Sequence, residues 1–170
     1  LPKVDGFDVL KTIREYSDVP VIMITARESE EDQLEGLGVG ADNYITKPFP
    51  LRVLRAHMEA LLRRSSASQS AAIVRKALRI EPEERRIYLD GRQLAVTPRE
   101  YDLLLYFVQN ERVVLKREAI LDAVWGFDYE GGTRTVDTIV KQLRKKMTDH
   151  YPYIQSVYGV GYRFEAVDYE

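Results

Sequence analysis

A run of basic side chains near the end of the chain is the part of this sequence best suited to chemistry. Between Arg134 and Met147, five lysines and arginines stand against a single acid, Asp137. The whole chain has a net charge of only −2, so this positive charge is local. Lysine and arginine neutralise phosphates, which supplies affinity for nucleic acid without reading its sequence. The segment therefore predicts a phosphate-binding surface.

The same segment has the periodicity of a helix with one apolar edge. Four apolar residues recur at i, i+4, i+7 and i+11, the spacing of a core-facing stripe: Val136, Val140, Leu143 and Met147. We expect a second set to face outward, with cations on its flanks: Thr135, Thr138, Ile139, Gln142 and Lys146, flanked by Arg134, Lys141 and Lys145. A solvated basic face is the alternative for an isolated charge run. A hairpin pattern around Gly159 and Gly161 follows, however, and favours DNA binding.

Composition excludes several other kinds of chemistry. The chain has no cysteine, which rules out disulfides and thiolate sites, and its two histidines, His57 and His150, are far apart. The sequence shows no nucleophile–base pair, glycine-rich phosphate loop or metal-ligand cluster, so we expect no catalytic residue, no metal site and no enzyme activity. No apolar run reaches the ~18 residues of a membrane span. We expect a cytoplasmic protein with no membrane partner.

The elements that must position this surface fall into two parts, separated by a small polar segment at residues 65–73 that is typical of a linker. Residues 1–64 alternate between helices and strands. We expect a helix near 7–14, an apolar strand at 19–24, a helix at 30–39, a strand at 44–46 and a helix at 51–64. The last helix places Leu54, Met58, Leu61 and Leu62 on one side. Alternating strands and helices predict an α/β fold with a doubly wound parallel sheet, its first strand buried on both faces.

Residues 74–170 have a different pattern. Short alternating strands at 78–80, 86–89 and 93–96 surround a hairpin signal at Asp90 and Gly91. Thr97, Pro98 and Glu100 then form the capping pattern of a helix start. A helix at 116–124, the basic helix and the terminal hairpin complete the order. We expect an α+β winged helix-turn-helix domain.

Residues 78–164 resemble the effector domain of OmpR/PhoB-type response regulators. The residues that carry the resemblance are Leu94, Val96, Thr97, Glu100, Tyr101, Leu103, Leu104, Leu121, Val124, Trp125, Gly126, the run Arg134, Thr135, Val136 and Asp137, and the run from Gly159 to Phe164. Residues 1–64 resemble the back half of that family's receiver domain, through Leu1, Pro2, Asp5, Gly6, Ile24, Thr25, Ala26 and the run from Gly40 to Phe49.

The resemblance implies a gap at the start of the receiver. The phospho-accepting aspartate and the acidic pair that holds Mg²⁺ would precede Leu1, so Mg²⁺ is expected only if that half is present, and this chain has no cofactor of its own. The missing half would also supply three of five sheet strands, so residues 1–64 are not expected to close their own core. Either the sequence is a fragment, or upstream residues are missing from it.

The resemblance also implies a phosphorylation switch. Thr25 would donate a hydrogen bond to the phosphoryl group, and Lys47, before a cis Pro48, would offset its charge. Tyr44 matches the aromatic residue that turns inward when the threonine moves. The alternatives are a strand-end threonine, an exposed lysine and a half-buried tyrosine.

In this family active receivers form homodimers through the face spanning residues 30–64, using salt bridges. Four positions that usually carry charge are neutral or nearly so here: Gln33, Asn43, Val53 and His57. We expect this face to dimerise through Leu34, Val53 and Leu54, weakly or in a different geometry.

For DNA, the resemblance assigns base contacts to Thr138 and Gln142, and glutamine suits adenine, which predicts an A·T-rich half-site. Ile139 stands where some relatives have a phosphate-contacting histidine and could instead touch a thymine methyl, and Trp125 would be part core and part phosphate contact. The remaining expected DNA contacts are Arg134, Thr135, Lys141, Arg144, Lys145, Tyr158, Gly159 and Tyr162. Tyr158 stands where the wing often has arginine, and Arg163, further along, has a structural alternative.

The function implied is a DNA-binding transcriptional regulator of a two-component system. Its partners would be double-stranded DNA, a sensor histidine kinase and, through residues 127–133, RNA polymerase. Phosphorylation would control dimerisation on direct repeats about one helical turn apart. The alternative is a phosphorylation-independent regulator or protein-interaction module with an atypical receiver face, which would show no DNA consensus.

Overall fold

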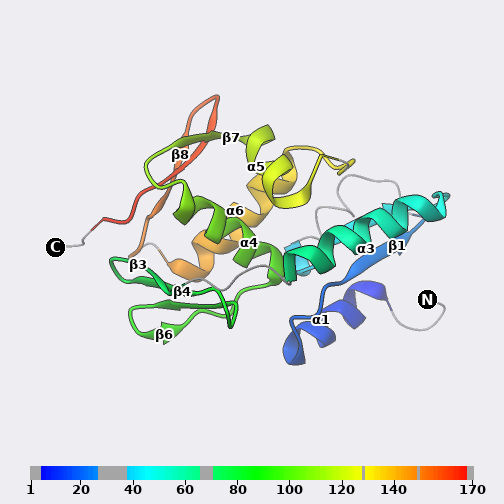
Figure 1. Ribbon diagram of the computed structural model, residues 1–170, viewed down its shortest axis with the longest axis horizontal. Helices are drawn as coiled ribbons and strands as arrows, with labels where there is room; N and C mark the ends of the chain where they lie inside the picture. The colour runs from blue at the N-terminus through cyan, green and yellow to red at the C-terminus, as the bar shows by residue number, and fades with distance from the viewer. Residues whose placement is uncertain (1–4, 27–37, 66–70, 128, 149, 168–170) are drawn as a thin grey trace. The chain divides into compact units, whose positions relative to one another are not determined.

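The computed structural model describes residues 5–26, 38–65, 71–127, 129–148 and 150–167 (Figure 1). Backbone contacts divide the chain into two compact units. The first contains residues 1–67 together with 97–99, and the second contains residues 68–96 and 100–170. Each unit has its own sheet or sheets and is described by itself.

The first unit starts with α1 (Gly6–Tyr16), whose N-terminus is capped by Asp5: its Oδ1 accepts from the Phe7 amide at 2.8 Å. Two strands follow, β1 (Ile22–Thr25) and β2 (Asn43–Thr46), and then α3 (Leu51–Ser65). The strands pair in parallel, as predicted. Most of the helix expected at 30–39 lies outside the described residues.

A buried ion pair that the sequence did not reveal ties this unit together. The Arg14 guanidinium donates to Asp42 Oδ2 at 2.9 Å, to the Gly40 carbonyl at 2.9 Å and to the Val19 carbonyl at 2.7 Å. The same Asp42 oxygen accepts from the Val21 amide at 2.7 Å, and Asp42 is only 2% exposed. Each of these polar groups is satisfied by another, which makes the burial of this charged pair tolerable.

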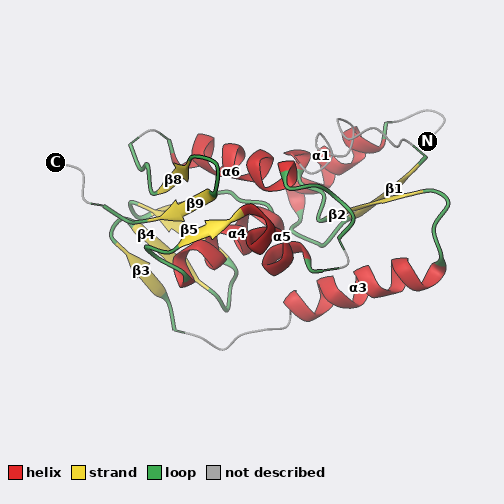
Figure 2. Cartoon of the chain, turned by 90° about the horizontal axis from the view of Figure 1, so that it is seen from above, coloured by secondary structure: helices red, strands yellow, loops and turns green. Residues whose placement is uncertain are grey.

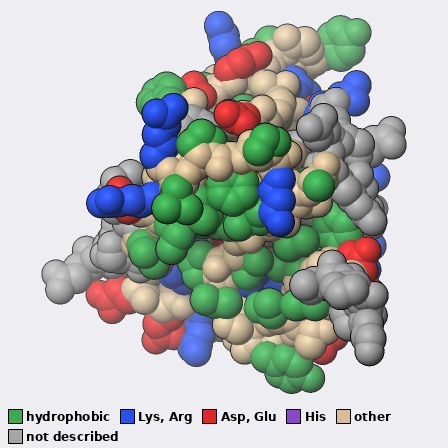
Figure 3. Space-filling model, turned by 90° about the vertical axis from the view of Figure 1, so that its right-hand side faces the viewer, with side chains coloured by type: hydrophobic (Ala, Val, Ile, Leu, Met, Phe, Trp, Pro, Cys, Tyr) green, Lys and Arg blue, Asp and Glu red, His purple; other side chains and the backbone are tan. Residues whose placement is uncertain are grey.

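The apolar side chains of this unit are only partly covered, and one prediction about them was wrong. β1 is not buried on both faces, since Ile24 is 40% exposed and its neighbours are half-buried. On α3, Leu61 is buried, but Met58 and Leu62 are 48% and 60% exposed. The reason is that β1 pairs only with β2 among the described strands, and a two-stranded sheet offers little surface to cover a helix. Figure 3, viewed from the side of α3 and β1, shows hydrophobic side chains gathered on that face.

The second unit opens with an antiparallel sheet of β3 (Ile73–Arg75), β4 (Leu78–Glu81), β5 (Arg86–Leu89) and β6 (Arg92–Gln93). Its strands lie side by side in sequence order, and β3, β4 and β5 are labelled in Figure 2. The predicted hairpin at Asp90 and Gly91 is present, with φ values of 50° and 74°. Two consecutive positive φ angles match the right-handed twist of the strands that they join.

Three helices and a second sheet complete this unit: α4 (Pro98–Gln109), α5 (Arg117–Trp125) and α6 (Arg134–Met147) with β7 (Val114–Lys116), β8 (Ile154–Val157) and β9 (Gly161–Phe164). The helix at 98 begins at proline, as the capping pattern predicted. β7 was not predicted. It pairs with β9 and makes the terminal hairpin a three-stranded sheet of order β7-β9-β8. The fold is the predicted winged helix-turn-helix.

Candidate nucleic-acid interface

The buried face of α6 is wider than the apolar periodicity predicted. Val136, Val140, Leu143 and Met147 are at most 1% exposed, which confirms the core stripe. Thr135 and Ile139, however, are only 2% and 1% exposed, so the prediction that they face outward was wrong. α5 packs beside α6, and the Tyr129 hydroxyl lies 3.2 Å from Thr135 Oγ1. A buried side chain offers no surface to a base or a phosphate.

This wider core rotates the exposed face of α6. Arg134, Thr138, Lys141 and Lys145 follow i, i+4, i+7 and i+11 spacing, and the three cations among them are exposed. The cations therefore lie in the middle of the exposed face and not on its flanks. Thr138 and Gln142 are half-exposed beside them. The Thr138 hydroxyl donates to the Arg134 carbonyl at 3.1 Å, which leaves its oxygen able to accept.

Two other cations of α6 do not point outward, because they bind neighbouring elements of the second unit. Lys146 was expected to face outward, but its Nζ donates to Glu100 of α4 at 2.5 Å. Arg144 was expected among the DNA contacts. It donates to the Ile154 carbonyl from Nε at 3.1 Å and from Nη2 at 2.8 Å, and to Ser156 Oγ at 2.9 Å. Both stand at the border of the buried stripe, where long side chains reach neighbouring elements.

The residues of the β8–β9 hairpin that were expected to contact DNA differ in their exposure. Tyr158 is fully exposed, and Gly159 adopts a φ of +71° at the turn. Tyr162, in contrast, is 5% exposed and packs edge-to-face on Phe107 at 6.4 Å, so its expected DNA contact does not fit the structure. Gly161 lets β7 and β9 approach, since a Cβ there would lie 2.1 Å from the Leu115 carbonyl oxygen.

One carboxylate joins α5, α6 and β9. Asp137 Oδ1 accepts from Arg117 Nε at 2.8 Å and from the Tyr162 hydroxyl at 2.5 Å. The hydrogen bond to Asp137 raises the pKa of Arg117, while burial and then the bond to Asp137 raise the pKa of Tyr162. Tyr162 therefore stays a neutral donor throughout the physiological range. The sequence did not predict this contact, because Asp137 and Tyr162 are distant along the chain.

Trp125 belongs to the core of this unit. It is 3% exposed, and its ring lies 6.1 Å from that of Tyr129. The structure thus supports the core part of its expected role and leaves little surface for a phosphate. Phe127, two residues later, is 88% exposed.

In the first unit, Thr25 and Tyr44 lie on the neighbouring parallel strands β1 and β2, and Lys47 directly follows β2. The Lys47 amide donates to the Thr25 carbonyl at 2.7 Å, and Tyr44 stands opposite Met23 in the register. The Lys47–Pro48 bond is cis, as predicted. Thr25 and Tyr44 are half-buried and Lys47 is exposed. Their role in a phosphorylation switch stays a prediction.

The expected dimer face is only partly described. Gln33 and Leu34 lie outside the described residues, and Val53 and Leu54 are half-buried. Asn43 does not present its side chain to a partner: it is 2% exposed, and its Nδ2 lies 2.5 Å from His57 Nδ1. The Asn43 and His57 side chains have paired with each other where the family usually places surface charges.

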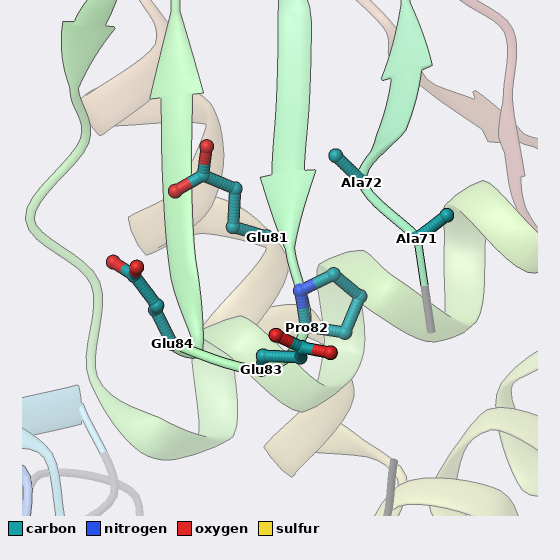
Figure 4. A pocket seen from close by; sticks show the side chains of 6 residues that line it. All are labelled: Ala71, Ala72, Glu81, Pro82, Glu83 and Glu84. Carbon is teal, nitrogen blue, oxygen red and sulfur yellow. The ribbon is translucent and has the colours of Figure 1, made fainter. Parts of the chain in front are cut away.

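Other possible sites do not add to this surface. An open pocket beside β4 is lined by Ala71, Ala72, Glu81, Pro82, Glu83 and Glu84 (Figure 4). Three carboxylates there repel phosphate. No three potential metal ligands cluster in the described ranges, and none of the helices described there is long and apolar enough to span a membrane.

The Asp137 contact gives a test of how the wing is attached. We expect Tyr162→Phe to lower the free energy of unfolding of the second unit by about 1.5–3 kcal/mol, because one hydrogen bond to a charged carboxylate is lost. Trp125, the chain's single tryptophan, lies in this unit, so urea unfolding followed by its fluorescence reports on it. Tyr158→Phe removes an exposed hydroxyl and should change nothing. Equal stability of both variants would contradict a structural role for the Tyr162 hydroxyl.

Two family models match the chain. Residues 1–59 match the model described as "Response regulator receiver domain", and residues 91–164 match "Transcriptional regulatory protein, C terminal". Curated relatives match over almost the whole chain. The chain is 42% identical over 172 residues to the uncharacterized transcriptional regulatory protein YclJ of Bacillus subtilis, covering 97% of this chain and 76% of that protein. It is 40% identical to the transcriptional regulatory protein SrrA of Staphylococcus aureus, covering 98% and 74%.

Solved structures are also similar to this chain. The response regulator DrrB of Thermotoga maritima, an OmpR/PhoB homologue, is 30% identical with a TM-score of 0.52, covering 98% of this chain and 76% of that one. The DNA-binding domain of Klebsiella pneumoniae RstA, solved in complex with the RstA box, is 29% identical with a TM-score of 0.52, covering 56% of this chain and 98% of that one. A mutant of RitR superposes with a TM-score of 0.75 at 28% identity, covering 95% and 73%.

Proposed function

Since this chain belongs to the OmpR/PhoB-type response regulators, we propose that it places α6 in the major groove of double-stranded DNA and acts from direct-repeat sites under the control of phosphorylation. The family makes the chain a DNA-binding transcriptional regulator. The observation that carries the proposal is the stripe of exposed cations on α6, Arg134, Lys141 and Lys145, on a helix whose opposite face is buried.

These cations would bind phosphates on the walls of the groove. At ~1.5 Å of rise per residue, Arg134 and Lys141 lie ~10 Å apart along the helix axis, and Lys141 and Lys145 lie ~6 Å apart. Three charges spread over about three turns follow a groove wall and do not converge on one phosphate. Such contacts release counterions, so affinity falls with salt for every DNA sequence.

Base reading falls to two half-exposed side chains beside the cations. Gln142 carries both a donor and an acceptor, the pair that matches the major-groove edge of adenine. Thr138 offers its hydroxyl oxygen, whose proton is engaged by the Arg134 carbonyl. Ile139 is buried, so the thymine contact expected of it is not proposed.

The phosphate contacts predict a change in salt dependence. Lys141→Ala should weaken binding to all duplexes and flatten the plot of log affinity against log salt by about 0.9, since one phosphate contact is lost. Fluorescence anisotropy with specific and random duplexes at several salt concentrations measures both quantities. Lys11→Ala removes an exposed cation in the first unit and serves as the control. An unchanged slope for Lys141→Ala would remove this residue from the interface.

The base contact predicts a change in preference. Gln142→Arg should shift selected sites toward guanine at one position of each half-site, because arginine matches O6 and N7 of guanine. Selection from random duplexes followed by sequencing measures this. Gln109→Arg adds the same charge at the exposed end of α4, and should leave the selected consensus as it is. If Gln142→Arg selects the wild-type consensus, Gln142 does not read bases.

The proposal has three further parts: control by a sensor kinase, contact with RNA polymerase and assembly as a homodimer. The support for a phosphorylation switch is the position of Thr25 and Lys47 at the adjacent ends of β1 and β2, where the Lys47 amide binds the Thr25 carbonyl. Side chains at this edge of a parallel sheet meet any group bound there. The neutral residues at 33, 43, 53 and 57 favour a dimer with few ion pairs.

Assembly on direct repeats predicts dependence on spacing. Two half-sites about one helical turn apart should bind two chains cooperatively, because both then face the same side of the duplex. Inserting about half a turn between them should abolish the cooperativity while leaving single-site affinity unchanged. Quantitative footprinting of both duplexes separates these quantities. Equal cooperativity at both spacings would exclude the direct-repeat arrangement.

A further inference from the structure

In the wing, the hairpin of β8 and β9, the basic side chain is held by other protein groups. Among residues 154–164, all of which are described, Arg163 is the single basic residue. Its Nη2 donates to Gln155 Oε1 at 2.8 Å and lies 3.2 Å from Glu165 Oε2. These contacts hold the Arg163 guanidinium on the sheet formed by β7, β8 and β9. A hairpin of this kind cannot rely on positive charge to approach DNA.

The tip of the hairpin is instead apolar and exposed. Tyr158 is fully solvent-exposed and Val160 is 38% exposed. Between them, Gly159 adopts a φ of +71°, and a Cβ at this glycine would meet nothing within 4 Å. The turn therefore projects its aromatic ring away from the body of the unit.

The hairpin is also held firmly against α6. Arg144 binds the Ile154 carbonyl and Ser156 Oγ on β8, and Asp137 binds the Tyr162 hydroxyl on β9. Both strands are thus tied to the helix proposed to enter the major groove. A four-residue strand spans ~13 Å, and the minor groove lies about half of the ~34 Å helical repeat away from the adjacent major groove. The turn at Gly159 and the exposed Tyr158 side chain extend beyond the strand, so the tip has the length needed to approach a groove ~17 Å away.

We propose that Tyr158, with Val160, contacts this minor groove as an apolar wedge, and that the wing reads deformability of the duplex rather than negative potential. The inference rests on the proposed placement of α6. Apolar side chains enter the minor groove by partly unstacking a base step, which is easiest at pyrimidine–purine steps such as TA. A cation would prefer the narrow groove of an A-tract. The wing should therefore favour a TA step at its position.

The test compares Tyr158→Ala and Tyr158→Arg with the wild-type full chain. Two duplexes share one α6 half-site and differ at the wing position, which holds either a TA step or an A-tract. Tyr158→Ala should lose about tenfold in affinity for the TA duplex, the scale of one aromatic contact, with an unchanged salt slope. Tyr158→Arg should steepen the slope by about 0.9 and transfer the preference to the A-tract.

Matched controls keep the outcomes distinct. Tyr16→Ala removes a tyrosine that is 83% exposed in the first unit and should bind as wild type. Because Tyr158 is exposed, its variants should unfold as wild type does. If Lys141→Ala weakens binding while Tyr158→Ala does not, the wedge is wrong and the proposed function stands. A flatter salt slope for Tyr158→Ala would also overturn it. If Lys141→Ala has no effect either, the placement of α6 itself fails.

Discussion

The attachment of the wing to α6 is the constraint on which the second unit depends. Asp137 accepts hydrogen bonds from both Arg117 and Tyr162, and Arg144 donates to β8 further along the helix. One acid and one cation of α6 thereby set the distance and angle between the helix and the hairpin. A domain that contacts two grooves needs this geometry before it meets DNA, because ordering it during binding would cost affinity.

Contacts within the second unit also decide which charges of α6 face outward. Of its five cations, Arg144 and Lys146 are held by the hairpin and by Glu100, while the exposed stripe keeps the other three. Charge counted along the sequence therefore overstates the charge available to DNA. Arg144 and Lys146, at the border of the buried face, bind other elements of the fold, whereas Arg134, Lys141 and Lys145 are exposed near the centre of the opposite face.

Much of the fold followed from sequence pattern, and the failures have physical causes. Pro98, the Asp90–Gly91 turn and the apolar stripe of Val136, Val140, Leu143 and Met147 act locally, so their patterns predicted the structure. Ile139 and Thr135 failed because periodicity gives the centre of a buried stripe but not its width, which depends on the neighbouring α5 and Tyr129. Asn43 and Tyr162 failed because their partners, His57 and Asp137, are distant in sequence and no local signal pairs them.

The cations of the exposed stripe slightly lower the stability of α6 as a helix. Lys141 and Lys145 are like charges one turn apart, and Arg134 faces the positive end of the helix dipole; each arrangement disfavours the helix by a few tenths of a kcal/mol. Asp137 in the first turn and the cations of the last turn act in the opposite sense. The six buried residues of α6, and not its surface, therefore hold it as a helix. A polyanion bound along the stripe would relieve the repulsion, so the strain within α6 and its affinity for phosphate have the same electrostatic origin.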